Sequence, residues 1–155
     1  MTKLKPKLFS VIKNYNKGQF VKDITAGLET IVKKYLDEGM NMYMLDKFAE
    51  ASVLFEKSAL AAATAPLSKV DSTAIYNAGF TAWMAKDYER AKSLFEQCIA
   101  NEYYYENGEV YAKLADVYTN LGDAKKGAEI LEQGFVMFPQ SQSILIGLIN
   151  YYISS

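Results

Sequence analysis

Apolar and small residues recur along this chain at the three- and four-residue intervals of an amphipathic helix, and one such pattern returns three times. The copies read Tyr35-x2-Glu38-Gly39-x2-Met42 with Ala51-x3-Phe55, Ile75-x2-Ala78-Gly79-x2-Ala82 with Ala91-x3-Phe95, and Tyr111-x2-Leu114-Ala115-x2-Tyr118 with Gly127-x3-Leu131, closed by Pro139. In each copy, 12 positions separate the small residue of the first half from the small residue of the second half. A fixed interval between two close-packing points predicts that each copy is a helix-turn-helix hairpin.

Turn residues between the apolar stretches predict where the helices begin and end. Leu121-Gly122-Asp123 is the clearest turn, because glycine suits the end of one helix and aspartate caps the next. Eight helices are expected, over residues 6–16, 21–45, 49–63, 73–85, 88–100, 109–121, 124–137 and from 141 onward. Residues 103–105 and 144–149 have a strand-like composition, but the repeat places them in a joint and in a helix, and we expect no sheet.

The repeated pattern resembles the tetratricopeptide repeat, whose signature reads W-x2-L-G-x2-Y, then A-x3-F, then P. The copies are 40 and 36 residues apart, against a usual period of about 34, so the joints carry inserted residues. The resemblance implies an all-α fold, a right-handed α-α superhelix of about three repeats with an N-terminal helix and a C-terminal half-repeat helix. On this interpretation a single domain contains a basic segment 1–31, repeats 32–65, 72–105 and 108–141, and the first helix of a truncated repeat at 142–155.

Proteins of this kind bind an extended peptide or a helix in a concave groove lined by the first helix of each hairpin. The resemblance implies an apolar slot of aromatic and methionine side chains in copies one and two, followed by a polar, acidic end in copy three. The candidate partner-binding residues are Met40, Tyr43, Met44, Tyr76, Phe80, Trp83, Asp116 and Asn120. Methionine and aromatic side chains often anchor protein interfaces. An aromatic stripe at helical spacing is also typical of a core, so a slot filled by the N-terminal helices themselves stays open as the alternative.

One subclass of these repeats grips the C-terminal carboxylate of chaperone tails with polar side chains on the concave wall. Leu36, Met40, Tyr76 and Phe80 stand at the groove-facing positions where those polar contacts would be expected. We therefore do not expect chaperone tails as the ligand.

Charge is unevenly distributed, although the net charge is only −1. Residues 1–34 contain eight lysines against Asp23 and Glu29, a surplus of six positive charges, and the remainder has 9 basic and 16 acidic residues. A basic N-terminal segment suggests contact with nucleic acid or an acidic membrane. Because no arginine cluster or nucleic-acid motif accompanies the lysines, we favour the interpretation that they form the wet side of N-terminal helices. No nucleic-acid partner is expected.

Composition limits the remaining classes of protein. Half of the 155 residues are apolar and 14% are aromatic, which is enough to bury a core and excludes a disordered chain. No apolar run reaches the roughly 18 residues of a membrane span, and no targeting segment is visible. We expect a soluble protein, cytoplasmic by default; a periplasmic or exported location would require a signal peptide removed before residue 1.

Residues suited to catalysis are scarce. The chain has no histidine, which removes the commonest general base and the commonest metal ligand. Its one cysteine, Cys98, lies seven residues after Ala91 and is expected to be a buried small hydrophobe rather than a nucleophile. We therefore expect no enzyme activity, no metal and no cofactor. The expected function is that of a non-catalytic protein–protein interaction scaffold.

The last expected helix is apolar nearly all round, whereas the terminal helices of repeat arrays are normally polar on their outer side. Leu145-x2-Leu148-Ile149-x2-Tyr152 matches the first half of a copy, 34 residues after the third. We infer either a fourth repeat cut between its two helices or a homodimer formed through this helix. The alternative function is therefore an assembly module, or an accessory N-terminal domain of a longer repeat protein whose activity lies outside this chain.

Overall fold

The computed structural model describes residues 4–14 and 17–155, and within these ranges it contains helices and no strand. The elements are α1 (Leu4–Asn14), α2 (Lys17–Met44), α3 (Phe48–Ala63), α4 (Ser72–Met84), α5 (Tyr88–Ala100), the short 3-10 helix η1 (Glu106–Gly108), α6 (Glu109–Asn120), α7 (Ala124–Met137) and α8 (Gln142–Ser154). The all-α fold predicted from the sequence is confirmed. The predicted end of the first helix at residue 16 falls outside the described residues.

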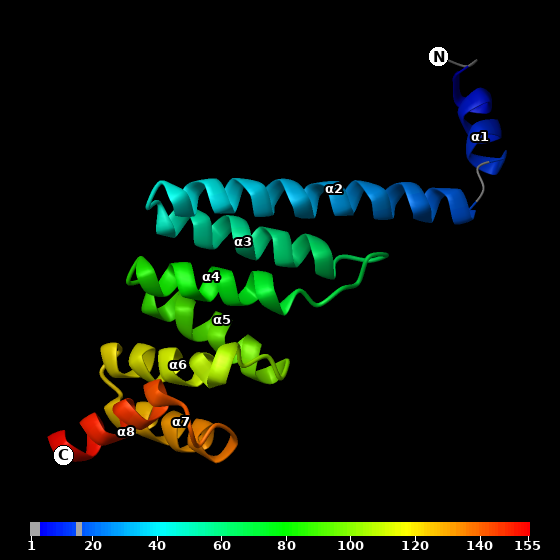
Figure 1. The fold of residues 1–155 in the computed structure, drawn as a ribbon. Helices are drawn as coiled ribbons and strands as arrows, with labels where there is room; N and C mark the ends of the chain where they lie inside the picture. The colour runs from blue at the N-terminus through cyan, green and yellow to red at the C-terminus, as the bar shows by residue number, and fades with distance from the viewer. Residues whose placement is uncertain (1–3, 15–16) are drawn as a thin grey trace.

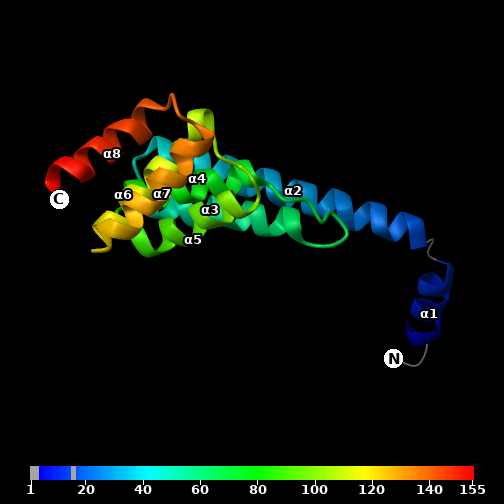
Figure 2. The same cartoon turned by 90° about the horizontal axis from the view of Figure 1, so that it is seen from below.

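From α2 to α8, consecutive helices pack against one another along the chain. Three hairpins, α2–α3, α4–α5 and α6–α7, stack in order, and α8 packs on α6 and α7 (Figure 1). Each helix contacts mainly its neighbours in the sequence, so the hairpins form an array rather than a closed bundle. The view from below shows the hairpins stacked over one another, with α1 and the start of α2 projecting to one side (Figure 2).

The helices α4, α5 and α7 each begin after an aspartate. The side chains of Asp71, Asp87 and Asp123 accept hydrogen bonds from the backbone N–H groups three residues further on, at 3.0, 3.2 and 3.0 Å. Such caps satisfy backbone donors that have no partner inside the helix. The turn inside each hairpin contains one residue with positive φ: Asp46, Lys86 and Gly122 occupy equivalent places. The Gly122-Asp123 turn predicted from the sequence therefore represents a geometry that all three copies share.

Close packing inside each hairpin depends on a missing side chain. A Cβ added to Gly39 would lie 2.9 Å from Cε1 of Phe55, and one added to Gly79 would lie 2.9 Å from Cε1 of Phe95. In the third copy the glycine is on the second helix instead, where a Cβ on Gly127 would lie 2.8 Å from the carbonyl oxygen of Ala115. The small residues that defined the repeat in the sequence are thus the contact points of the three hairpins.

A polar contact crosses from the first hairpin to the second within this apolar packing. The buried Ser52 hydroxyl donates a hydrogen bond to the carbonyl oxygen of Ala78 at 2.7 Å and accepts one from Nε of Arg90 at 2.9 Å. Arg90 also forms an ion pair with Glu56. These bonds satisfy a hydroxyl that would otherwise be costly to bury between α3, α4 and α5.

Cys98 on α5 has no exposed surface and belongs to the core cluster that runs from Ala51 to Ile144. Burial raises the pKa of its thiol to about 12, so the group stays protonated at neutral pH. The burial of Cys98 confirms the sequence-based prediction that this residue is a buried hydrophobe. The protonated thiol is not the nucleophilic form, which is the thiolate.

Candidate functional site

An open groove of about 490 Å³ lies on the side of the array formed by the first helices of the hairpins. It is lined by α2 through Met40 and Tyr43, by α3 through Phe55, by α4 through Tyr76, Asn77, Phe80 and Thr81, and by Tyr105, Glu109 and Lys113 from the region where α6 begins. All three hairpins therefore contribute to one surface. We call this surface the aromatic groove.

Stacked rings form the base of the aromatic groove. The ring of Tyr76 stacks on that of Tyr105, with centroids 4.2 Å apart, and lies 6.2 Å from the ring of Phe80. On its other side, Tyr76 meets the fully buried Phe95 at 6.0 Å. Burial of Tyr76, and then the neighbouring Tyr105 and Glu109, raises the pKa of its hydroxyl above the usual range. The base of the groove is thus continuous with the core, and the Tyr76 hydroxyl is neutral at physiological pH.

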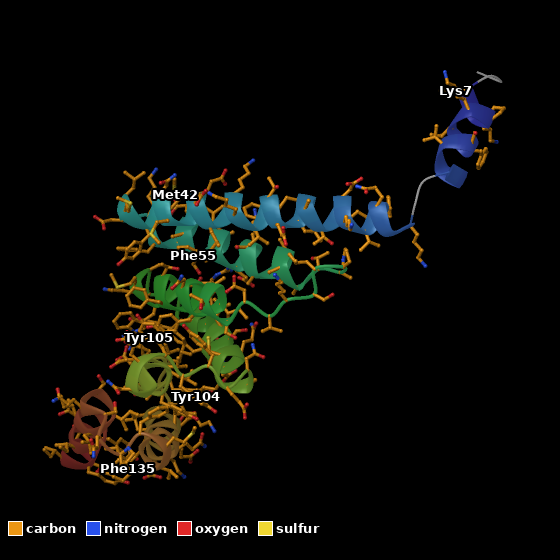
Figure 3. The ribbon with its side chains drawn as sticks, turned by 45° about the vertical axis from the view of Figure 1, so that its right-hand side comes forward. Lys7, Met42, Phe55, Tyr104, Tyr105 and Phe135 are labelled. Atoms are coloured by element: carbon orange, nitrogen blue, oxygen red, sulfur yellow. The ribbon has the colours of Figure 1, made fainter. Side chains whose placement is uncertain are left out.

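Tyr104 and Tyr105, adjacent in the joint between the second and third hairpins, point in different directions (Figure 3). Tyr104 packs between Tyr111 and Phe138, with ring centroids 5.6 and 5.7 Å away. Tyr105 has a φ of 56° and ends on Tyr76 in the groove. Tyr104 is thus packed between hairpins, whereas Tyr105 is partly exposed in the groove.

Tyr105 reaches the groove because the joint turns tightly just after it. Asn107 and Gly108 also have positive φ, at 50° and 75°, and a Cβ on Gly108 would lie 2.5 Å from the ring of Phe138. Glycine is the residue that takes such a conformation without steric cost. The Gly108 position therefore requires glycine both for its backbone angles and for the space beside Phe138.

Charged groups are found at the α6 end of the groove. Nζ of Lys113 lies 4.6 Å from the ring centroid of Trp83 and 5.4 Å from that of Phe80, and it is 3.6 Å from a carboxylate oxygen of Glu109. A cation over an aromatic face is an attractive contact. Lys113 therefore links the aromatic residues of α4 to the acidic start of α6.

Beside this end lies a hydrogen-bonded cluster of Trp83, Asp116 and Asn120. Nε1 of Trp83 donates to a carboxylate oxygen of Asp116 at 2.7 Å. The Asn120 amide donates to the carbonyl oxygen of Asp116 at 2.8 Å and to its carboxylate at 3.2 Å. The cluster joins α4 to α6 and fixes the position of the indole ring next to Phe80.

The structure separates the eight sequence-predicted residues into three groups. Met40, Tyr43, Tyr76 and Phe80 line the aromatic groove together. Trp83, Asp116 and Asn120 form the hydrogen-bonded cluster beside it. Met44 is three-quarters exposed, one turn beyond Met40, and does not line the groove.

Six lining residues are not among the eight candidates predicted from the sequence: Phe55, Asn77, Thr81, Tyr105, Glu109 and Lys113. Lys113 had a usable signal, since it follows Glu109 by four positions and precedes Asp116 by three, which puts all three on one face of α6. Tyr105 had none, because it reaches the groove through backbone angles in a joint.

The lining also bears on the alternative in which the N-terminal helices fill the slot. Every lining residue lies between Met40 and Lys113, and α1 stands at the opposite end of α2 (Figure 1).

Two further hollows border the same helices. One, of about 590 Å³, lies between α2 and the 64–71 joint, with Lys33, Leu36 and Thr73 in its wall; the other, of about 450 Å³, lies between α6 and α8, with Asp116 in its wall.

No protein-family model matches this chain, and no curated protein does. The tetratricopeptide resemblance therefore rests on the residue pattern alone. Among the described residues, no three His, Cys, Asp or Glu side chains are grouped as a metal ion would need. Within the same part of the chain, none of the helices is both long enough and apolar enough to cross a lipid bilayer.

Proposed function

We propose that this protein is a non-catalytic, tetratricopeptide-like interaction module that binds a peptide or helix of a partner protein in the aromatic groove. The observation that carries the proposal is an open apolar surface made by all three hairpins, in which Met40, Tyr43 and Tyr105 remain 48%, 37% and 44% exposed. Apolar and aromatic side chains grouped in this way are characteristic of interface centres.

The construction of the groove favours an apolar anchor residue in the ligand. Its base is already packed, because the ring of Tyr76 contacts both Tyr105 and core residue Phe95. A preformed base lowers the entropy lost on binding. Met40 at the rim is flexible and can adapt to the shape of the anchor. Glu109 and Lys113 can orient polar groups of the ligand at the α6 end.

The ionisable groups of the groove support binding rather than catalysis. Glu109 and Lys113 pair with each other, and Tyr76 stays protonated because burial raises the pKa of its hydroxyl. A general acid or base works best with a pKa near the operating pH. Tyr76, whose pKa is raised, is therefore poorly suited to that role.

Alanine at Phe80 is expected to weaken peptide binding by roughly 30-fold, because interface aromatic residues of this kind contribute about 2 kcal/mol. Peptides would be selected from a phage-displayed library on the immobilised chain. Their dissociation constants would then be measured from the fluorescence of Trp83, the only tryptophan. Phe80→Ala would be measured by calorimetry as well, since Phe80 lies 5.9 Å from the Trp83 ring.

Two methionines on the same helix provide a matched control for this experiment. Met40→Ala should weaken binding about fivefold through the lost apolar contact, and Met44→Ala should leave it unchanged. If selected peptides bind wild type, Phe80→Ala and Met40→Ala with equal affinity, the groove is not the binding site. If no peptide is enriched, the groove does not bind peptides and the proposal fails.

Assembly through α8 is a second candidate function, supported by one specific observation. Ile149 occupies the register position of Gly39, Gly79 and Ala115, which are all buried against the second helix of their own hairpins. Ile149 is instead more than half exposed, together with Ile146 and Ile153 on the same face. An apolar face of this kind favours association with another helix.

Self-association through α8 is expected to depend on concentration and to be lost in the double variant Ile149→Glu/Ile153→Glu. Val136→Glu on α7 is the control, because Val136 is as exposed as Ile153, at 80% against 78%, and lies on another helix. Light scattering coupled to size-exclusion chromatography gives the mass of each variant over a range of concentrations. A wild-type chain that is monomeric throughout that range would rule out the homodimer.

A further inference from the structure

The N-terminal arm, residues 4–14 and 17–27, stands apart from the stacked hairpins. The Ser58 hydroxyl on α3 binds the carbonyl oxygen of Val32 at 3.0 Å, so the last turns of α3 lie beside the middle of α2. The beginning of α2 continues past the end of α3, and α1 lies beyond it (Figures 1 and 2). Lys7 on α1 is accordingly remote from Phe55 and Tyr104 in the array (Figure 3).

Apolar side chains on this arm face water. Leu4, Leu8 and Val11 follow one another at helical spacing on one side of α1 and are 72%, 56% and 58% exposed. Val21 and Ile24 on α2 are also exposed, by 41% and 37%. A helix with this pattern normally has a partner for its apolar side.

The N-terminal part of the chain carries a net positive charge. Residues 1–27 contain six lysines and one acidic residue, Asp23, whereas the rest of the chain is net negative. Further along α2, Lys33 pairs with Asp37 at 2.5 Å and Lys34 with Glu38 at 4.0 Å, so those two lysines are locally balanced. If the lysines only formed the solvent-facing side of an amphipathic helix, the apolar side of that helix would be buried. On α1 the apolar side is exposed as well.

We propose that the N-terminal arm binds the surface of a lipid bilayer that contains anionic lipids. A bilayer surface satisfies both features of the arm at once, because lysines meet anionic headgroups while leucine and valine side chains enter the acyl boundary. Nucleic acid would match the lysines and leave Leu4, Leu8 and Val11 in water. Pairing two arms of different copies would cover the apolar side but would bring two strongly basic segments together.

The position of the arm makes this contact compatible with groove binding. Met40 and Tyr43 lie near the other end of α2, so a bilayer in contact with α1 leaves the aromatic groove open to a partner. The membrane contact is independent of what the groove binds. The two activities can therefore be tested separately.

Vesicle co-sedimentation of the full chain tests the membrane proposal. The chain is expected to sediment with vesicles of phosphatidylcholine and phosphatidylglycerol mixed three to one, and not with vesicles of phosphatidylcholine alone. The double variant Lys5→Gln/Lys7→Gln should bind the mixed vesicles about 30-fold more weakly, since each lysine near an anionic surface contributes about fivefold. Leu8→Glu/Val11→Glu should lose vesicle binding altogether.

Matched substitutions in the body of the protein control for general effects of charge and apolarity. Lys69→Gln/Lys125→Gln removes two exposed lysines, and Leu60→Glu/Val136→Glu changes two exposed apolar residues, all outside the arm. Both controls should bind vesicles as wild type does, and circular dichroism should show equal helix content in all variants.

Three outcomes would overturn the proposal. The first is the absence of sedimentation with the mixed vesicles. The second is equal binding by the Lys5→Gln/Lys7→Gln or Leu8→Glu/Val11→Glu variant. The third is that the arm binds something other than vesicles. It would then bind duplex DNA, with Leu8→Glu/Val11→Glu leaving that binding intact, or it would self-associate, with either arm variant abolishing the association, and in neither case would the chain bind vesicles.

Discussion

Replacing Phe95 by alanine is expected to lower the free energy of unfolding by about 3–5 kcal/mol, the range for large aromatic residues truncated in a core. Phe95 has no exposed surface, packs against the backbone at Gly79 and meets the ring of Tyr76. Native domains are stable by only about 5–15 kcal/mol, so this loss would remove a large part of the total. Urea unfolding followed by circular dichroism measures it.

Phe135 provides the same substitution at a partly exposed site. It lies on α7 and is 39% exposed, so Phe135→Ala should cost less than about 1 kcal/mol. Phe95→Ala should also weaken peptide binding, because the base of the aromatic groove rests on this ring. Equal urea midpoints for Phe95→Ala and Phe135→Ala would mean that the second hairpin is not packed as described.

Replacing Gly79 by leucine is expected to lower the free energy of unfolding by about 2–3 kcal/mol through overpacking. Even the first added carbon would lie 2.9 Å from the Phe95 ring and 3.3 Å from Cβ of Leu94, and both neighbours are fully buried. Leucine has a better helix propensity than glycine by nearly 1 kcal/mol, and the expected loss is what remains after that gain. Thermal and urea unfolding of the variant give the measurement.

Gly27 on α2 is the matched control for this substitution. A Cβ at Gly27 would meet no atom within 4 Å, so Gly27→Leu should raise the free energy of unfolding by up to about 1 kcal/mol through helix propensity alone. The two substitutions therefore change stability in opposite directions. A stabilising effect at Gly79 would show that α4 and α5 do not approach as closely as the structure places them.

The hairpins could be predicted from the sequence because close packing restricts residue type at fixed intervals. Gly39 and Gly79 carry the signal most clearly, since only glycine leaves room for the phenylalanine 16 positions later. The third copy reverses the arrangement, with Ala115 on the first helix and Gly127 on the second, yet the approach is equally close. The interval of 12 positions is the same in all three copies, so the pattern survives this exchange.

The aromatic groove could be predicted only in part, for a physical reason. Met40, Tyr43, Tyr76 and Phe80 lie on regular helices, where residue spacing determines which side chains share a face. Tyr105 lies in a joint, where its direction follows from positive φ angles at three of four consecutive residues. Helical periodicity contains no information about such angles. Trp83 shows a second difficulty, because spacing does not reveal that its Nε1 is hydrogen-bonded to Asp116.

The consecutive packing of the hairpins has a mechanical consequence. Because α2, α4 and α6 each belong to a different hairpin, a small tilt of one hairpin against the next changes the width of the surface between them. Such a tilt would have to move the contacts that join α3 to α4 and α5 to α6. A partner that presses the hairpins together or spreads them apart would change the curvature of the whole molecule, and the elastic energy of that bending would set how tightly the partner is held.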